Sequence, residues 1–178
     1  MLRDLGATVI DADEAAHAAY EPGSPGFDSV VKEFGPDYVR DGRIDRAQLG
    51  ELVFNDAAAR QRLNAIVHPL VREWMAARTG EAALSGAAIV VQDVPLIFEN
   101  GLERIYSTVV LVYVPEHQQL TRLVEGRGIS EDRARAMIAA QMPIEEKRKL
   151  AHHVIDNSGS REATRQQVEW LWDHLVAK

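Results

Sequence analysis

Acidic side chains directly follow three short apolar segments of the sequence. They are Asp11 with Asp13, then Asp93, then Asp156, which Asn157 follows. If these segments are parallel strands, the side chains lie at carboxyl ends of strands, where open α/β sheets bind their ligands. Asp11 and Asp13 are only two residues apart, so their like charges can raise the pKa of one of the two carboxyls. Such a pair can also help to hold hydrated Mg²⁺. The alternative for any single aspartate is an ordinary helix N-cap, and for Asp11 the two interpretations are equally good.

A second candidate group is the basic segment at residues 122–149. It carries seven basic and five acidic side chains, whereas the whole chain has 20 basic and 27 acidic ones. Its basic members are Arg122, Arg127, Arg133, Arg135, Lys147, Arg148 and Lys149. A solvated helical face of mixed charge is the commoner reason for such a run. The alternative is an arginine-bearing lid over an anionic ligand, because the planar guanidinium binds phosphate oxygens through two parallel hydrogen bonds.

Two further patterns are weaker. A D-x-D pair after a strand also occurs in phosphohydrolases, where Asp11 would be the nucleophile and Asp13 the acid and base. That chemistry needs a suitably placed lysine, and the lysines of this chain lie in charged helical stretches or at its end. His152 and His153 are adjacent, so their side chains point in different directions and we expect no metal site from them.

Strands alternate with helices at both ends of the chain, which predicts an α/β fold with a parallel sheet, flanking helices and a helical insertion. Expected strands cover residues 7–10, 87–92, 108–114 and 154–155. Expected helices cover residues 14–20, 27–34, 45–54, 56–78, 116–126, 131–141 and the residues after Ser160. Residues 35–43 are expected to form a turn region. Pro69 is expected to break or kink the helix that contains it, because proline lacks the backbone donor.

This length suits one domain with a single core, so we expect one domain over residues 1–178. Its core would comprise residues 1–25, 81–121 and 150–178. The helical insertion would cover residues 26–80, and the lid would cover residues 122–149.

Composition restricts the class of protein. With 46% hydrophobic and 26% charged residues, the chain resembles an average globular protein. It has no cysteine, which excludes disulfides, thiolate metal ligands and cysteine nucleophiles. The net charge of −7 disfavours nucleic acid as a partner. No apolar run is long enough for a membrane span and no signal-peptide pattern opens the chain, so we expect a cytoplasmic protein.

Several motifs occur together and in a characteristic order: VIDADEAA (9–16), HPLV (68–71), DVPLIFE (93–99) and VIDNSG (154–159). Together they resemble the dephospho-CoA kinase family across nearly the whole chain. The resemblance implies a P-loop kinase-like fold with a helical acceptor-binding insertion and a helical lid. It also implies that the γ-phosphate of ATP, bound with Mg²⁺, is transferred to the ribose 3′-hydroxyl of dephospho-CoA. This is the last step of coenzyme A biosynthesis.

The resemblance also assigns roles to individual residues. Asp13 matches the catalytic base, and Arg122 and Arg127 match catalytic, ATP-binding cations of the lid, with Arg135 as a weaker match. The residues expected beside the nucleotide are Asp156, Asn157 and Gly159. Those expected on the acceptor side are Asp11, Asp13, His68, Asp93 and Glu99, although a structural role is at least as good an interpretation of His68.

The sequence departs from the family pattern in two places. His17 stands where the family commonly has arginine, and a neutral imidazole binds an anionic substrate less strongly. The chain also contains no Gly-Lys pair, so it has no G-x-x-x-x-G-K-[ST] loop. Residues 1–6 resemble the end of the helix that should follow this loop, so roughly twenty residues of the family pattern are expected upstream. The alternative to an incomplete chain is a non-catalytic member that binds dephospho-CoA or a protein.

The 178-residue chain expressed alone is therefore expected to phosphorylate no dephospho-CoA and to bind ATP weakly. Backbone N–H groups of the glycine loop and its lysine hold the triphosphate in such kinases, and arginines on a lid cannot replace them. Titration calorimetry with MgATP and a coupled kinase assay would compare this chain with a form extended upstream. Equal activity in both forms would contradict the expectation.

Overall fold

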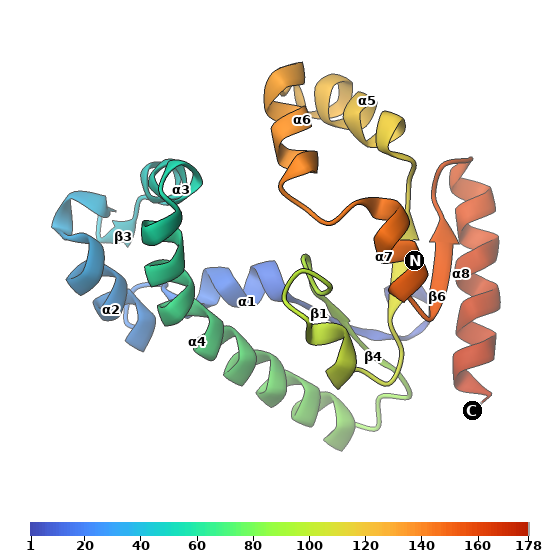
Figure 1. The fold of residues 1–178 in the computed structure, drawn as a ribbon. Helices are drawn as coiled ribbons and strands as arrows, with labels where there is room; N and C mark the ends of the chain where they lie inside the picture. The colour runs from blue at the N-terminus through green and yellow to red at the C-terminus, as the bar shows by residue number, and fades with distance from the viewer. Residues whose placement is uncertain (178) are drawn as a thin grey trace. The chain divides into compact units, whose positions relative to one another are not determined.

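The computed structural model describes residues 1–177 (Figure 1). Its contacts divide the chain into two compact units. One unit is the continuous stretch 6–94, and the other combines residues 1–5 with residues 95–177. The two units are described separately.

The unit of residues 6–94 is built on a pair of parallel strands, β1 (Thr8–Asp11) and β4 (Val90–Asp93). Thr8 lies opposite Val90, and Asp11 lies opposite Asp93. The β-branched residues of both strands favour the extended conformation. Helices α1 (Ala12–Ala19) and α4 (Ala57–Leu84) pack against this pair. Ile10, Ala15 and Met75 form the buried cluster between these elements.

The rest of this unit is mainly helical. It consists of α2 (Pro25–Phe34), η2 (Pro36–Tyr38), β2 (Val39–Arg40), β3 (Arg43–Ile44) and α3 (Arg46–Asn55). Val30, Ile44 and Leu49 form its buried core. Because α2 and α3 both pack against α4, the long helix joins this core to the parallel strands.

β2 and β3 form a small antiparallel hairpin in the region that the sequence predicted only as a turn. Its two connecting residues, Asp41 and Gly42, have φ values of 50° and 73°. Positive φ at both central residues is the property of a type I′ turn, for which Asp-Gly is a favoured pair. The Asp-Gly signal was present in the sequence, but strands of two residues are too short to show a periodic pattern.

Pro69 was expected to break or kink its helix; the break was wrong, because α4 continues through Pro69 over 28 residues, and the kink stays a prediction. Proline removes one backbone donor, which leaves the carbonyl of Ala65 without its usual partner. Both residues are exposed, so water can satisfy that carbonyl. Packing of α4 against α1, α2 and α3 compensates for the lost hydrogen bond.

The other unit contains a second pair of parallel strands, β5 (Val110–Tyr113) and β6 (His153–Asp156). Its helical elements are η1 (Arg3–Leu5), η3 (Leu102–Ile105), α5 (Glu116–Arg127), α6 (Glu131–Ala139), α7 (Ile144–Leu150) and α8 (Arg161–Val176). Ile155, Val168 and Leu171 form the buried core, and Met1, Leu2 and Leu5 pack against it. Ser160 begins α8 as its N-cap, as expected from the sequence.

The α/β class with parallel strands and flanking helices is confirmed. The parallel strands form two separate pairs, one in each unit. The predicted division into core, insertion and lid does not follow the two units, and it stays a prediction. None of the helices within residues 1–177 is long and apolar enough to cross a membrane.

Gly26 on α2 provides a test of the packing in the first unit. A methyl group at this position would overlap the carbonyl oxygen of Ala19 and lie 2.7 Å from Cδ1 of Leu70. Gly26→Ala is therefore expected to lower the free energy of unfolding by about 1–3 kcal/mol. Gly50 on α3 has no atom near the same position. Gly50→Ala is expected to raise the free energy by up to about 1 kcal/mol, because alanine favours the helix. Urea unfolding of both variants measures the two effects, and equal stability would contradict this account.

Candidate active site

Three aspartates gather where β1 and β4 end, and we call Asp11, Asp13 and Asp93 the carboxylate cluster. Asp11 and Asp93 are the last residues of β1 and β4 and lie opposite each other in the strand register. Asp13 belongs to the first turn of α1. The structure therefore brings together the three acidic residues that the sequence placed at the ends of two apolar segments.

Asp11 is the N-cap of α1. Its Oδ1 accepts hydrogen bonds from the backbone N–H groups of Asp13, at 2.8 Å, and Glu14, at 3.4 Å. This confirms the helix-cap interpretation of Asp11. The strand stops at Asp11. Asp13 lies in the helix that follows, where its side chain is exposed.

The carboxylate cluster disfavours negative charge on Asp93. Partial loss of hydration raises the pKa of Asp93, although the residue as a whole is exposed. The negative charges of Asp11 and Asp13 raise this pKa further. Like charges held this close favour a bound proton or a cation at the ends of these strands.

His68 lies on the exposed side of α4, next to Pro69. No interaction that joins it to the carboxylate cluster is found in the part of the chain that the structure describes. The residues of α4 that pack around Ile10 are Val71, Trp74 and Met75, further along the helix. The expected substrate-binding role of His68 stays a prediction.

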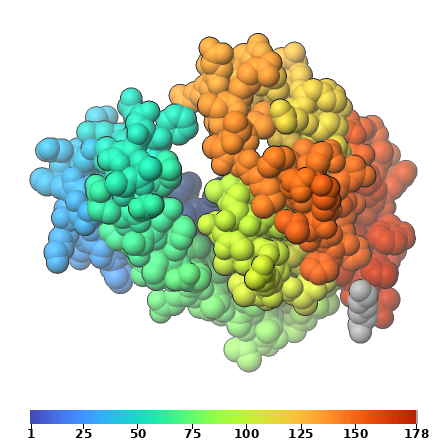
Figure 2. All heavy atoms as spheres, in the orientation of Figure 1, coloured from blue at the N-terminus to red at the C-terminus, as the bar shows by residue number. Residues whose placement is uncertain are grey.

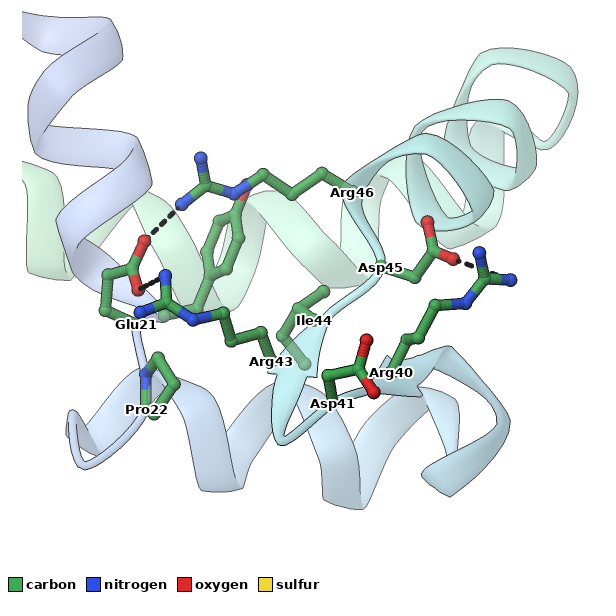
Figure 3. A pocket seen from close by; sticks show the side chains of 9 residues that line it. Glu21, Pro22, Arg40, Asp41, Arg43, Ile44, Asp45 and Arg46 are labelled. Carbon is green, nitrogen blue, oxygen red and sulfur yellow. Dashed lines mark hydrogen bonds and ion pairs between the residues drawn. The ribbon is translucent and has the colours of Figure 1, made fainter.

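A pocket of about 420 Å³ lies beside the C-terminal end of α1 in the same unit (Figure 3). Glu21 projects into it between two arginines, with ion pairs of 2.6 Å to Arg46 and 3.3 Å to Arg43. Arg40 pairs with Asp45 at 3.3 Å on the other side of the hairpin. The charges that line this pocket balance one another, so it shows no preference for an anion.

In the other unit, Arg122 on α5 contacts the loop at residues 156–159, which follows β6. Its Nη2 donates a hydrogen bond of 2.7 Å to the backbone oxygen of Asn157. The Oδ1 of Asn157 accepts a hydrogen bond from the hydroxyl of Thr164 on α8. The structure thus brings together two of the residues expected at the nucleotide, Arg122 and Asn157.

The same loop is held by its own hydrogen bonds. The carboxylate of Asp156 accepts the backbone N–H of Ser158 at 2.8 Å. Hydrogen bonds from the hydroxyl and backbone of Ser158 hold the pKa of Asp156 below its ordinary value. Gln167 on α8 binds both the backbone N–H and the backbone oxygen of Asp156. Gly159, the remaining expected residue of this loop, is exposed.

Arg127 is the last residue of α5 and is exposed, five residues after Arg122. At about 100° per residue, two side chains five residues apart leave a helix in different directions. Arg127 therefore does not share the loop contact that Arg122 makes. Arg135 on α6 is held by Glu131 of the same helix at 2.6 Å, so its charge is already paired.

Glu99, which was expected on the acceptor side, is paired with other parts of its own unit. Its Oε1 lies 2.8 Å from Nζ of Lys147 and accepts the backbone N–H of Met142 at 2.9 Å. The sequence placed Lys147 in an exposed basic run, whereas the structure buries it. No sequence signal identifies this pairing, because its partners lie far apart along the chain and the neighbours of Lys147 are charged.

No group of three or more His, Asp or Glu residues arranged to hold a metal occurs within residues 1–177. Nδ1 of His152 accepts the backbone N–H of Val109, and the ring of His153 packs edge-on against His174. Both histidines thus contact other parts of their unit.

Comparison with known proteins agrees with the motifs. A sequence model of dephospho-CoA kinases matches residues 1–163. The chain belongs to the dephospho-CoA kinase family.

Dephospho-CoA kinases of several bacteria resemble the chain over almost its whole length. The enzyme of Geobacillus kaustophilus is 48% identical, over 98% of this chain and 89% of its own length. That of Symbiobacterium thermophilum is 46% identical, over 97% of this chain and 72% of its own. A crystal structure from Thermus thermophilus matches with a TM-score of 0.80 at 34% identity, over 98% of this chain and 87% of that one. The dephospho-CoA kinase of Campylobacter jejuni matches with a TM-score of 0.71 at 28% identity, over 98% and 88%.

The raised pKa of Asp93 predicts a pH-dependent cost in stability. A carboxyl whose pKa is higher in the folded state does not lower the free energy of unfolding well below about pH 4, where it is protonated in both the folded and the unfolded state. As the pH rises, the unfolded state ionises first and stability falls. Asp93→Asn is therefore expected to raise the melting temperature at pH 7 and to have a smaller effect at pH 4.

Asp56→Asn is the matched control for this prediction. Hydrogen bonds from the backbone of Ala59 and Ala58 lower the pKa of Asp56, the N-cap of α4. Asparagine keeps the capping oxygen but loses the charge, so this variant is expected to lose stability at pH 7 and less at pH 4. Calorimetric melting at both values measures the two trends. Equal signs for the two variants would contradict the assigned electrostatics.

Proposed function

We propose that the residues of this chain, in a form that also carries the glycine loop, catalyse the reaction for which its family is named, with ATP as phosphoryl donor and dephospho-CoA as acceptor. The observation that carries the assignment of roles is the carboxylate cluster, where an exposed Asp13 lies beside two further carboxylates. Phosphoryl transfer to an alcohol needs a carboxylate that accepts the hydroxyl proton, and cations that neutralise phosphate charge. The chain contains both kinds of group, carboxylates at the ends of β1 and β4 and arginines on α5.

Asp13 is the proposed general base. It is exposed on the first turn of α1, and the capping contact of Asp11 fixes the backbone that carries it. A base must come within hydrogen-bond reach of the proton that it accepts. An exposed carboxylate on a rigid helix turn meets this requirement for the ribose 3′-hydroxyl, whereas Asp11 already uses its Oδ1 as a helix cap.

Arg122 and Arg127 are the proposed cations for the phosphates of ATP. The contact of Arg122 with the Asn157 carbonyl uses one N–H of its guanidinium and leaves others for phosphate oxygens. Arg127 provides a second exposed positive charge at the end of α5. Such charges act most strongly where negative charge develops in the transition state.

The loop at residues 156–159 is the proposed adenine contact. The loop is already ordered by hydrogen bonds within it, between Ser158 and Asp156, and by hydrogen bonds with Gln167 and Thr164 of α8. A preformed loop costs little conformational entropy when the ligand binds. Asp156, Asn157 and Gly159 are the residues that we assign to it.

Mg²⁺ is the proposed ion that accompanies ATP. The crowded charge of the carboxylate cluster fits a hydrated Mg²⁺, which typically takes one or two protein carboxylates and keeps several waters. Asp11 and Asp13 are the residues that would help to hold its water shell. When bound, the ion neutralises phosphate charge.

On the acceptor side we keep Asp11, Asp13, Asp93 and His68 as proposed contacts of dephospho-CoA. The contacts of Glu99 favour a different role, developed below. The cytoplasm is the proposed location, because a chain without cysteine depends on no disulfide.

Two other functions are less well supported. Membership of the kinase family counts against a phosphohydrolase with an aspartate nucleophile, and so does the use of Asp11 as a helix cap. The extent of the similarity to named dephospho-CoA kinases likewise favours the kinase over a non-catalytic member of the family.

Asp13→Asn tests the proposed base in a form of the enzyme that includes the glycine loop. The change keeps the shape of the side chain and removes its basicity. Turnover is expected to fall by about 10²–10⁴-fold, the usual contribution of a general base, while the affinity for dephospho-CoA stays within about twofold. A coupled ADP-release assay and titration calorimetry measure the two quantities.

Glu14→Gln is the matched control, because Glu14 is the next residue of the same helix turn and is also exposed. It is expected to keep near-normal turnover. If Asp13→Asn retains full turnover, or if Glu14→Gln loses as much, Asp13 is not the base.

A further inference from the structure

Lys147 is a buried cation outside the catalytic groups described so far. It lies on α7 and is 8% exposed, in the middle of a run of charged residues. Its Nζ lies 2.8 Å from Oε1 of Glu99 and 3.1 Å from Oε1 of Gln141. Lysine is rarely buried unless it is paired, so this contact stabilises α7 in its packed position.

One carboxylate oxygen of Glu99 contacts two different parts of the chain. Besides Lys147 on α7, its Oε1 accepts the backbone N–H of Met142, in the segment between α6 and α7. Burial alone would raise the pKa of Glu99, but the hydrogen bonds from Lys147 and the Met142 backbone outweigh it and lower this pKa. Glu99 is therefore stabilised as a carboxylate in the folded state.

A second contact fixes the same helix. The hydroxyl of Tyr113, at the end of β5, donates a hydrogen bond of 2.6 Å to Glu145 on α7. This hydrogen bond raises the pKa of Tyr113, and the guanidinium of Arg148 lies over its ring at 5.0 Å. We call Glu99, Tyr113, Glu145 and Lys147 the α7 anchor.

Exposed residues predominate in the helices between β5 and α7, although the hydrogen bond from Arg122 to the Asn157 carbonyl joins α5 to the loop after β6. α5 has no buried residue, and Ala134 is the buried residue of α6. The two helices pack against each other and are drawn in yellow to orange at the surface (Figure 2). Their position depends on the points where the chain enters α5 and leaves α6, and the α7 anchor lies beside both.

We propose that Glu99 and Lys147 are positioning residues that fix the base of the α5–α6 pair and thereby the place of Arg122 and Arg127. Glu99 acts through Lys147 and Met142, without touching the substrate. This differs from the acceptor-side role that the sequence resemblance implies for Glu99. The part of the proposal that concerns catalysis rests on the proposed function, whereas the part that concerns local order does not.

Hydrogen exchange of the 178-residue chain tests the local part. In Lys147→Met, Glu99 loses its side-chain partner and keeps only backbone N–H groups as partners, and we expect residues 122–142 to exchange at least about tenfold faster. Exchange in α8 and in the β1–β4 pair is expected to be unchanged. Lys149→Met is the matched control, because Lys149 is on the same helix and its pair with Glu146 is exposed.

Lys147→Arg keeps the charge and is expected to restore most of the protection that Lys147→Met loses. Unchanged exchange of residues 122–142 in Lys147→Met would overturn the proposal. So would equal acceleration along the whole chain, because that result describes a general loss of stability and no specific positioning.

Kinetics of the form with the glycine loop test the catalytic part. Glu99→Gln and Lys147→Met are expected to lower kcat by at least about tenfold, with KM for dephospho-CoA within about twofold, because misplaced arginines fail mainly in the transition state. Lys149→Met is expected to leave both constants unchanged.

If Glu99→Gln raises only KM for dephospho-CoA, with normal exchange, Glu99 contacts the acceptor and the proposal is wrong. If exchange changes as expected and kcat does not, the anchor stands and the roles of Arg122 and Arg127 are wrong.

Discussion

The pairing of β1 with β4 is the constraint on which the carboxylate cluster depends. Backbone hydrogen bonds between the strands place Asp11 opposite Asp93, and the capping contact of Asp11 then starts α1 and places Asp13. These backbone interactions hold together three negative charges that repel one another. Partial burial, and then the charges of Asp11 and Asp13, raise the pKa of Asp93, so the protonated form of this carboxyl is favoured more than in an isolated aspartate.

The residues that we propose for the site lie in both units. The unit of residues 6–94 provides carboxylates at the ends of its parallel strands, whereas the unit of residues 95–177 provides arginines and a preformed loop after β6. In both units the functional groups follow strand ends, which is where α/β sheets generally bind ligands. Hydrogen bonds to backbone atoms hold Asp11, Arg122 and Asp156, as in the contact of Arg122 with Asn157.

Much of the fold could be predicted from the sequence, because its strands are short β-branched runs and its helices have recognisable caps such as Ser160. The features that were missed depend on contacts between distant residues. Pro69 lies inside an intact helix because neighbouring helices support it, and Lys147 is buried because Glu99 pairs with it. The carboxylate cluster was found because strand ends mark it, whereas the hairpin after η2 was missed because each of its strands has only two residues.

The packing of Met1, Leu2 and Leu5 around Ile155, Val168 and Leu171 has a consequence for how the protein is made. On the ribosome, residues 1–5 emerge well before their partners, which emerge only with β6 and α8. The continuous stretch 6–94, by contrast, holds all of its own internal contacts and can fold while the rest of the chain is still being translated. The apolar N-terminal segment stays exposed throughout that interval, so the order of synthesis makes it the part of this core most open to chaperones and proteases.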